Sequence, residues 1–412
     1  VIYSGSVVVD WHDTSGLFGG RPGLVAIFTH HNAGSAPLGP EVQSIATSAD
    51  RGRTWTAYVH NPVIANPGVR DFRDPKVFWH APTQHWVMVV THNGDRVHFY
   101  TSKNLRQWTF TGEFGAGQGA HNATWECPDL FELPIDDDPR RTQWVLNVST
   151  FHETDASNRV GMQYFVGDFN GTTFTNANAA STVLTTDQGR DNYAAVTWSD
   201  VQASHGHRLM IGWMNDWAYA RVIPTQPWRG AMTVPRELRL GRLRGGVRLL
   251  QRPLRELECL REQQTHWDHQ IIAPNASLWH REVRAALEIV MTIRLEAATE
   301  CGVRVLSGDG EQTTVGYDVP TATLFVDRTR SGKTDFAPTF AGRYGGPLDA
   351  TEGSVMLRIF LDRCSVEVFG NEGECAVTSL IFPEEDTRGL EFYALGGTAR
   401  ILALDVYHLR SV

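Results

Sequence analysis

The chain has 412 residues, of which 42% are hydrophobic and 20% are charged, as in an ordinary folded globular protein. Its 46 acidic residues outnumber its 37 basic residues, and the formal net charge is −9. This balance argues against a nucleic-acid binder or an anionic-membrane binder, because both need a basic face, and the sequence holds no apolar run of about 18 residues that could span a bilayer.

Short strand patterns repeat through the first half of the chain. Apolar runs that end on polar residues begin at Leu24, Trp86, Trp144 and Leu209. Strand, polar turn and aromatic-threonine closure recur every ~50–65 residues, which is typical of a β-propeller with four-stranded blades around a central channel. Four units fit before about residue 240. Because the first unit begins in mid-pattern, a larger propeller with a missing first part fits better than a four-bladed one.

The pattern changes after an Arg- and Leu-rich stretch, residues 235–264, which contains the one candidate short helix. Alternating strands follow at 284–297, 321–329, 354–370, 376–382 and 401–409. This spacing predicts an antiparallel β-sandwich. The predicted all-β organisation is therefore a β-propeller over residues 1–245, a linker over 246–268 and a β-sandwich over 269–412.

Polar residues at equivalent points of the repeats should converge over the channel. They are Asp74, Glu126, Asp191, Asn215 and Asp216. Paired carboxyl groups with tryptophans nearby are what a glycosidase needs, since one carboxylate stabilises the developing positive charge and one carboxylic acid protonates the leaving oxygen. Two structural alternatives stay open, because Asp74 before proline could only open a turn and Glu126 could be a half-exposed residue at a strand start. The pattern alone predicts a sugar-binding or sugar-cleaving propeller.

Seven motifs stand in one order along nearly the whole chain: YSGS (3–6), FRDPK (72–76), WECPDLFEL (125–133), DNYAAVTW (191–198), WMNDWAYA (213–220), PWRGAMTVPREL (227–238) and SVEVFGNEGE (365–374). Together they resemble glycoside hydrolase family 32, the invertases, inulinases, levanases and related fructosyltransferases. The resemblance implies a five-bladed β-propeller followed by a β-sandwich. It also implies cleavage of β-D-fructofuranosyl bonds with retention, in a fructan such as levan or inulin or in sucrose.

The resemblance assigns roles to individual residues. It makes Glu126 the general acid/base and Asp74 the transition-state stabiliser. The substrate-binding residues that it implies are Tyr3, Ser4, Arg73, Asp191 and Trp217. We expect no metal and no other cofactor, and the five cysteines, which lack CxxC spacing, are expected to be small buried thiols.

One family motif is not in these residues. The family nucleophile is an aspartate in a Trp-Met-Asn-Asp-Pro-Asn-Gly motif of the first blade, and this chain has no such motif. Trp213–Asp216 looks similar, but Trp217 follows it and its position matches the last blade, so Asp216 is not the expected nucleophile. We therefore expect a first blade, on the order of 40–70 residues, to be largely missing from this chain.

Three functions stay open. The first is a hydrolase that releases sugar from a fructan or from sucrose. The second is a fructotransferase that passes the fructosyl unit to a sugar hydroxyl, including intramolecular difructose anhydride formation. The third is a non-catalytic fructan-binding propeller. A polymer substrate predicts a secreted protein, whereas linkage preference and oligomeric state are not encoded in the motifs.

Overall fold

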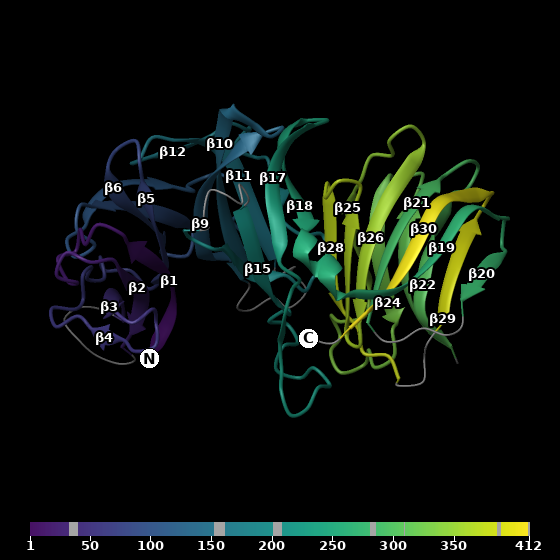
Figure 1. Ribbon diagram of the computed structural model, residues 1–412, viewed down its shortest axis with the longest axis horizontal. Helices are drawn as coiled ribbons and strands as arrows, with labels where there is room; N and C mark the ends of the chain where they lie inside the picture. Colours follow the sequence, from purple (N-terminus) through teal and green to yellow (C-terminus); the bar gives the residue numbers. More distant parts are fainter. Residues whose placement is uncertain are drawn as a thin grey trace.

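The computed structural model describes residues 1–32, 40–151, 161–200, 208–280, 286–308, 310–384 and 389–410, and the strands in these residues form five sheets (Figure 1). The fold is all-β, as predicted. Residues 284–285 of the predicted strand 284–297 lie outside the described residues. No helix in the described ranges is long and apolar enough to cross a membrane.

Two four-stranded antiparallel sheets begin the chain. The first contains β1 (Ile2–Asp10), β2 (Gly23–His31), β3 (Glu41–Ser48) and β4 (Thr56–Ala57). The second contains β5 (Phe72–His80), β6 (His85–His92), β7 (Arg96–Ser102) and β8 (Thr109–Phe114). Buried and half-buried residues alternate along β2, the period of a strand in a packed sheet.

A ten-stranded sheet follows. Its first group is β9 (Thr124–Ile135), β10 (Asp138–Phe151), β11 (Gly161–Phe169), β12 (Phe174–Asn176) and β13 (Leu184–Thr185). Its second group is β14 (Tyr193–Thr197), β15 (Arg208–Met214), β16 (Ala231–Met232), β17 (Arg236–Leu243) and β18 (Gly246–Pro253). One parallel pair, Leu240 with Ile135, joins the two groups. Within each group the strands pair antiparallel, as they do in the two earlier sheets.

The second half is the predicted β-sandwich, made of two six-stranded sheets. One has the order β19 (Arg261–Ile272), β30 (Ala399–Leu409), β21 (Leu287–Arg294), β26 (Ser354–Asp362), β27 (Ser365–Gly370) and β28 (Cys375–Leu380). The other has the order β20 (Ser277–His280), β29 (Gly389–Leu395), β22 (Glu300–Gly308), β23 (Glu311–Asp318), β24 (Thr323–Arg330) and β25 (Arg343–Pro347). A large apolar core fills the space between them.

The two halves lie against each other, with β28 beside the strands of the first half (Figure 1). A 3-10 helix, η2 (Arg255–Leu260), lies between β18 and β19. One apolar cluster crosses the boundary, because Met214 and Tyr219 of the first half pack with Phe340, Leu380 and Phe382 of the second. The sandwich therefore lies close to the segment that follows β15.

Candidate functional site

The first strands of three successive groups, β5, β9 and β14, each contain an extra residue relative to the strand beside them. At each of these β-bulges one non-glycine residue takes a left-handed backbone conformation. The residues are Asp74 with φ of 64°, Cys127 with φ of 46° and Ala194 with φ of 50°. Bulges redirect the side chains around them, and they tolerate the prolines that follow Asp74 and Cys127.

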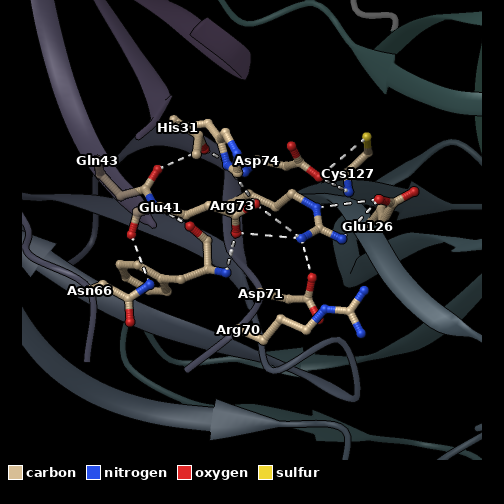
Figure 2. A network of polar contacts seen from close by, with 12 residues as sticks. His31, Glu41, Gln43, Asn66, Arg70, Asp71, Arg73, Asp74, Glu126 and Cys127 are labelled. Atoms are coloured by element: carbon tan, nitrogen blue, oxygen red, sulfur yellow. Dashed lines mark hydrogen bonds and ion pairs between the residues drawn. The ribbon is translucent and has the colours of Figure 1, made fainter. Parts of the chain in front are cut away.

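The residues just before the three bulge residues meet. Arg73 donates from Nη2 to Glu126 Oε1 over 3.0 Å and from Nε to the same oxygen over 3.3 Å (Figure 2). The Tyr193 hydroxyl donates to the other carboxylate oxygen, Glu126 Oε2. The Glu126 side chain keeps 17% of its surface exposed. Its carboxyl group is therefore fixed from two sides and can still be reached from outside.

Arg73 is surrounded by acidic groups. Its Nη1 lies 3.3 Å from Glu41 Oε1, and it also donates to Asp71 Oδ1 (Figure 2). Burial alone would lower the pKa of Arg73, but the hydrogen bond to Asp71 and the charges of Glu126 and Glu41 raise this pKa above its ordinary value. The guanidinium group therefore stays charged and holds three carboxylates together.

Asp74 is buried beside this cluster, with 7% of its surface exposed. Its Oδ2 accepts a hydrogen bond of 2.9 Å from the Cys127 backbone N–H, and its own N–H donates to Thr29 Oγ1 over 2.9 Å. Burial raises the pKa of Asp74 to about 6, against the lowering effect of the Cys127 N–H, and the charge of Glu126 raises it further. Asp74 therefore changes its charge in the range where many enzymes work.

Two predicted substrate residues lie at one side of the cluster. The Tyr3 ring stacks on His31 with 4.6 Å between the ring centroids, and His31 Nδ1 lies 3.7 Å from Glu41 Oε1. Tyr3 keeps 41% of its surface exposed, and Ser4 is also exposed. A partly exposed tyrosine ring thus connects to the carboxylate cluster through His31.

Trp217 lies at another side. Its ring centroid is 4.8 Å from that of Trp213, which in turn lies 6.2 Å from the Tyr193 ring in an edge-to-face contact. Trp217 keeps 43% of its surface exposed. An aromatic row therefore runs from the Glu126 carboxylate to the surface.

The structure places the other two aspartates elsewhere. Asp191 has no exposed surface, and its carboxylate binds Arg328 of the sandwich over 2.6 Å and Tyr219 over 2.5 Å. Asp216 is equally buried and binds Arg190 Nε over 2.8 Å. Both carboxylates are thus engaged with arginines, and the contacts of Asp191 run to the second half of the chain.

Sequence reasoning missed three members of the cluster, Tyr193, Glu41 and Asp71. Tyr193 had a usable signal, because it stands at the same point of its strand as Arg73 and Glu126 do in theirs. An alignment of the three strands on their bulge residues would have found it. Asp71 also had a signal, because it stands two residues before Arg73 and residues at that spacing point to the same face of a strand. Glu41 has no such signal, since only the fold brings it to Arg73.

No three His, Cys, Asp or Glu side chains are grouped so that they could hold a metal ion, as far as the described residues go. None of the five cysteines, which all lie in the described residues, forms a disulfide. Cys301 and Cys375 are buried, as predicted, but Cys259 is exposed because it lies in η2, which buries none of its residues.

Two family models cover the chain. The glycosyl hydrolases family 32 N-terminal domain matches residues 1–253, and the family 32 C-terminal domain matches residues 256–408. Among curated proteins, a levanase of Bacillus subtilis is 48% identical over 416 residues, covering 100% of this chain and 60% of the relative. An extracellular exo-inulinase of Aspergillus niger is 39% identical over 442 residues, covering 99% of this chain and 81% of the relative.

Among solved structures, the exo-inulinase of Aspergillus awamori has a TM-score of 0.91 at 35% identity and covers 100% of this chain and 84% of that chain. The chain spans 60% of the length of the B. subtilis levanase and 46% of the length of a second Bacillus levanase. With both domain models matched from residue 1 to residue 408, the chain belongs to glycoside hydrolase family 32.

Proposed function

We propose that the protein is a retaining glycoside hydrolase of the β-fructofuranosidase type that acts on a fructan, levan or inulin, or on sucrose. The observation that carries this proposal is the Glu126 carboxyl group, held between Arg73 and Tyr193 beside the buried Asp74. The names of the relatives, levanase and exo-inulinase, point to the same substrates.

Glu126 is proposed as the general acid/base. Its two oxygens are oriented by different donors, so the carboxyl group has one fixed position relative to a bound sugar. In the first step it protonates the departing sugar oxygen, and in the second it takes a proton from the attacking water. Its partly exposed surface agrees with a group that must meet both a sugar and a water molecule.

Asp74 is proposed as the transition-state stabiliser. It would bind fructosyl hydroxyls, and its negative charge would favour the positive charge that develops at the ring carbon. Burial strengthens this effect, because a charge in a low-dielectric site interacts more strongly than one in water. The backbone N–H of Cys127 holds the carboxylate in place over 2.9 Å.

The nucleophile is proposed to lie outside these 412 residues. Asp216, in the one similar motif, is fully buried and paired with Arg190, which fits a structural role. A retaining mechanism needs two carboxyl groups ~5–5.5 Å apart. We therefore propose that the active protein has a five-bladed propeller, that most of the first blade is not among these residues, and that it supplies the aspartate that attacks the ring carbon.

The partly exposed rings of Tyr3 and Trp217 are proposed to contact the fructosyl unit, with Ser4 beside Tyr3. Aromatic faces suit the apolar faces of sugar rings, which supports this assignment. Asp191 is the weakest of the predicted substrate residues, because its carboxylate is buried against Arg328. A polymeric substrate and the extracellular exo-inulinase relative favour a secreted protein.

The test is chromatographic analysis of products after incubation of the full-length protein with levan, inulin and sucrose separately. Released fructose or short oligosaccharides support the hydrolase, and a difructose anhydride or a longer chain identifies the transferase instead. Glu126→Gln keeps the shape of the side chain and should lower turnover by about 10²–10⁴-fold, the usual contribution of general acid–base catalysis. No product from any of the three substrates contradicts the proposal.

A further inference from the structure

The segment from Asp187 to Tyr193 connects the sandwich with the candidate site. Its first residues bind β28 of the sandwich, and its last residue binds Glu126. It includes the first three residues of the motif at 191–198, and the proposed function gives Asp191, the first of them, no direct contact with substrate. The contacts along this segment show what holds it in place.

The beginning of the segment covers the edge of the sandwich sheet that ends at β28. The Gln188 N–H donates to the Ala376 carbonyl over 2.7 Å, and the Asp191 N–H donates to the Thr378 carbonyl over 3.3 Å. Between them Gly189 lies so close that an added Cβ would be 2.0 Å from the Thr378 carbonyl oxygen. The segment therefore pairs with β28 almost as an additional strand would.

Arg328 of β24 fixes Asp191 from the sandwich side. Both side chains have no exposed surface. Arg328 donates to Asp191 Oδ2 over 2.6 Å, to the Tyr219 hydroxyl over 2.9 Å and to the carbonyls of Phe340 and Leu380 over 2.7 and 3.0 Å. The planar guanidinium group thus has a partner in several directions, which defines one position for the Asp191 carboxylate.

The end of the segment carries this position to the site. Two residues after Asp191, the Tyr193 hydroxyl donates to Glu126 Oε2. The next residue, Ala194, is the bulge residue, and its N–H donates to Ser149 Oγ over 3.1 Å. Tyr193 is therefore fixed on one side by the first half of the chain and on the other side by Asp191, which the sandwich holds.

We propose that Arg328 of the sandwich is a positioning residue for the reaction, acting through Asp191 and Tyr193 on the orientation of Glu126. This inference rests on the proposed function, in which Glu126 is the acid/base. It assigns to the second domain a part in catalysis although Arg328 touches no reacting group.

The test uses Arg328→Lys, Tyr193→Phe and the double variant in the full-length protein, with kcat and KM measured on the fructan that it cleaves. Each single change should lower kcat by about tenfold, the effect of one lost hydrogen bond to a charged group, and change KM by less than about twofold. Because Arg328 is proposed to act through Tyr193, the double variant should be no slower than Tyr193→Phe. Effects that multiply in the double variant would overturn the proposal.

The matched control is Arg358→Lys. Arg358 donates from Nε to Glu288 Oε1 over 2.6 Å, and Glu288 is fully buried within the sandwich. This change also weakens an arginine–carboxylate pair in which the carboxylate is buried, so it should lower stability and leave kcat unchanged. An equal fall of kcat in Arg358→Lys would mean that general loosening of the sandwich explains the result, against the proposal. If Arg328→Lys does not fold, Tyr219→Phe removes only the hydroxyl next to Asp191 and gives the same readout.

Hydrogen exchange separates this inference from the proposed function. The amides of Gln188 and Asp191 bind β28, so their exchange reports the position of the segment without any substrate. We expect faster exchange across the segment in Arg328→Lys than in Arg358→Lys. Equal exchange in the two variants refutes the positioning role, whereas a wild-type protein that cleaves neither a fructan nor sucrose refutes the proposed function.

Discussion

Asp74 should destabilise the folded protein at neutral pH, and Asp74→Asn should therefore stabilise it. Burial raises the pKa of this carboxyl from 3.8 to about 6. A difference of roughly 2 units between the folded and the unfolded state corresponds to about 3 kcal/mol. Because the folded pKa is the higher one, the protonated form of Asp74 stabilises the folded protein. This contribution to the free energy of unfolding is fully present below the unfolded pKa and is lost as the pH rises through about 6.

Asparagine suits the position. Its side-chain oxygen can still accept the Cys127 N–H, and asparagine tolerates the left-handed backbone with φ of 64°. Without a titrating group, the variant lacks this pH dependence. Between about pH 8 and pH 4.5 the stability advantage of Asp74→Asn over the wild type should shrink by about 2 kcal/mol. Activity should be lost at every pH, since the transition state loses its charged partner.

The assay is urea unfolding of both proteins at the two pH values. Asp50→Asn is a control of opposite sign, because hydrogen bonds from Thr54 and Ser48 lower the pKa of the exposed Asp50 to about 2. Both assay pH values lie above the ordinary pKa of an aspartate, so Asp50 is ionised at both, and its loss should lower the free energy of unfolding to the same extent at pH 8 and at pH 4.5. A difference between Asp74→Asn and the wild type that is the same at both pH values would refute the reasoning from burial.

Three further predictions follow from the site and its supports. The proposed role of Asp74 needs its ionised form, and burial raises the pKa of this group to about 6. We therefore expect kcat/KM to decrease as the pH is lowered from about 6. A profile that is flat down to pH 4.5 would contradict that role. Gly189→Ala should destabilise the protein by ~1–3 kcal/mol in thermal unfolding, because the new Cβ would lie 2.0 Å from the Thr378 carbonyl oxygen. Gly310→Ala is the control: a Cβ there has no atom within 4 Å, but the backbone has a φ of 90°. The control therefore measures backbone strain without a clash. Trp217→Ala should raise KM by about tenfold and leave kcat within a factor of about three, because the exposed Trp217 ring is proposed to bind the sugar equally before and during the reaction. An unchanged KM would show that Trp217 is not part of the binding site.

The strands of regular alternation were predictable from the sequence, but several others were not. The predicted run 354–370 contains β26 and β27, and the predicted run 401–409 matches β30 except for its first two residues. β22 and β23 were missed, because Gly302 and Gly316 interrupt their apolar pattern. In the fold Gly302 is required by close approach, since an added Cβ would lie 2.1 Å from the Val315 carbonyl oxygen.

The site was predictable only where chemistry and local motif coincide. Glu126, Asp74 and Arg73 stand in motifs, and the structure brings them together. The Asp-Pro pair could be read as the start of a turn, whereas the structure has a β-bulge within a strand there and another at Cys127-Pro128. The partner of Asp191 is 137 residues away, at Arg328, and no local pattern marks a contact over that separation.

The closure of the β28 edge has a consequence for domain exchange. A chimera that joins the first half of this chain to the sandwich of a relative brings a foreign strand edge against residues 187–191. The new edge would have to offer carbonyl groups to Gln188 and Asp191 and leave no side chain in front of Gly189. A crossover between residues 253 and 256, where the two family models meet, exchanges the complete sandwich. The chimera keeps the contacts of residues 187–191 only if the new sandwich has a matching strand edge and a buried arginine at the place of Arg328.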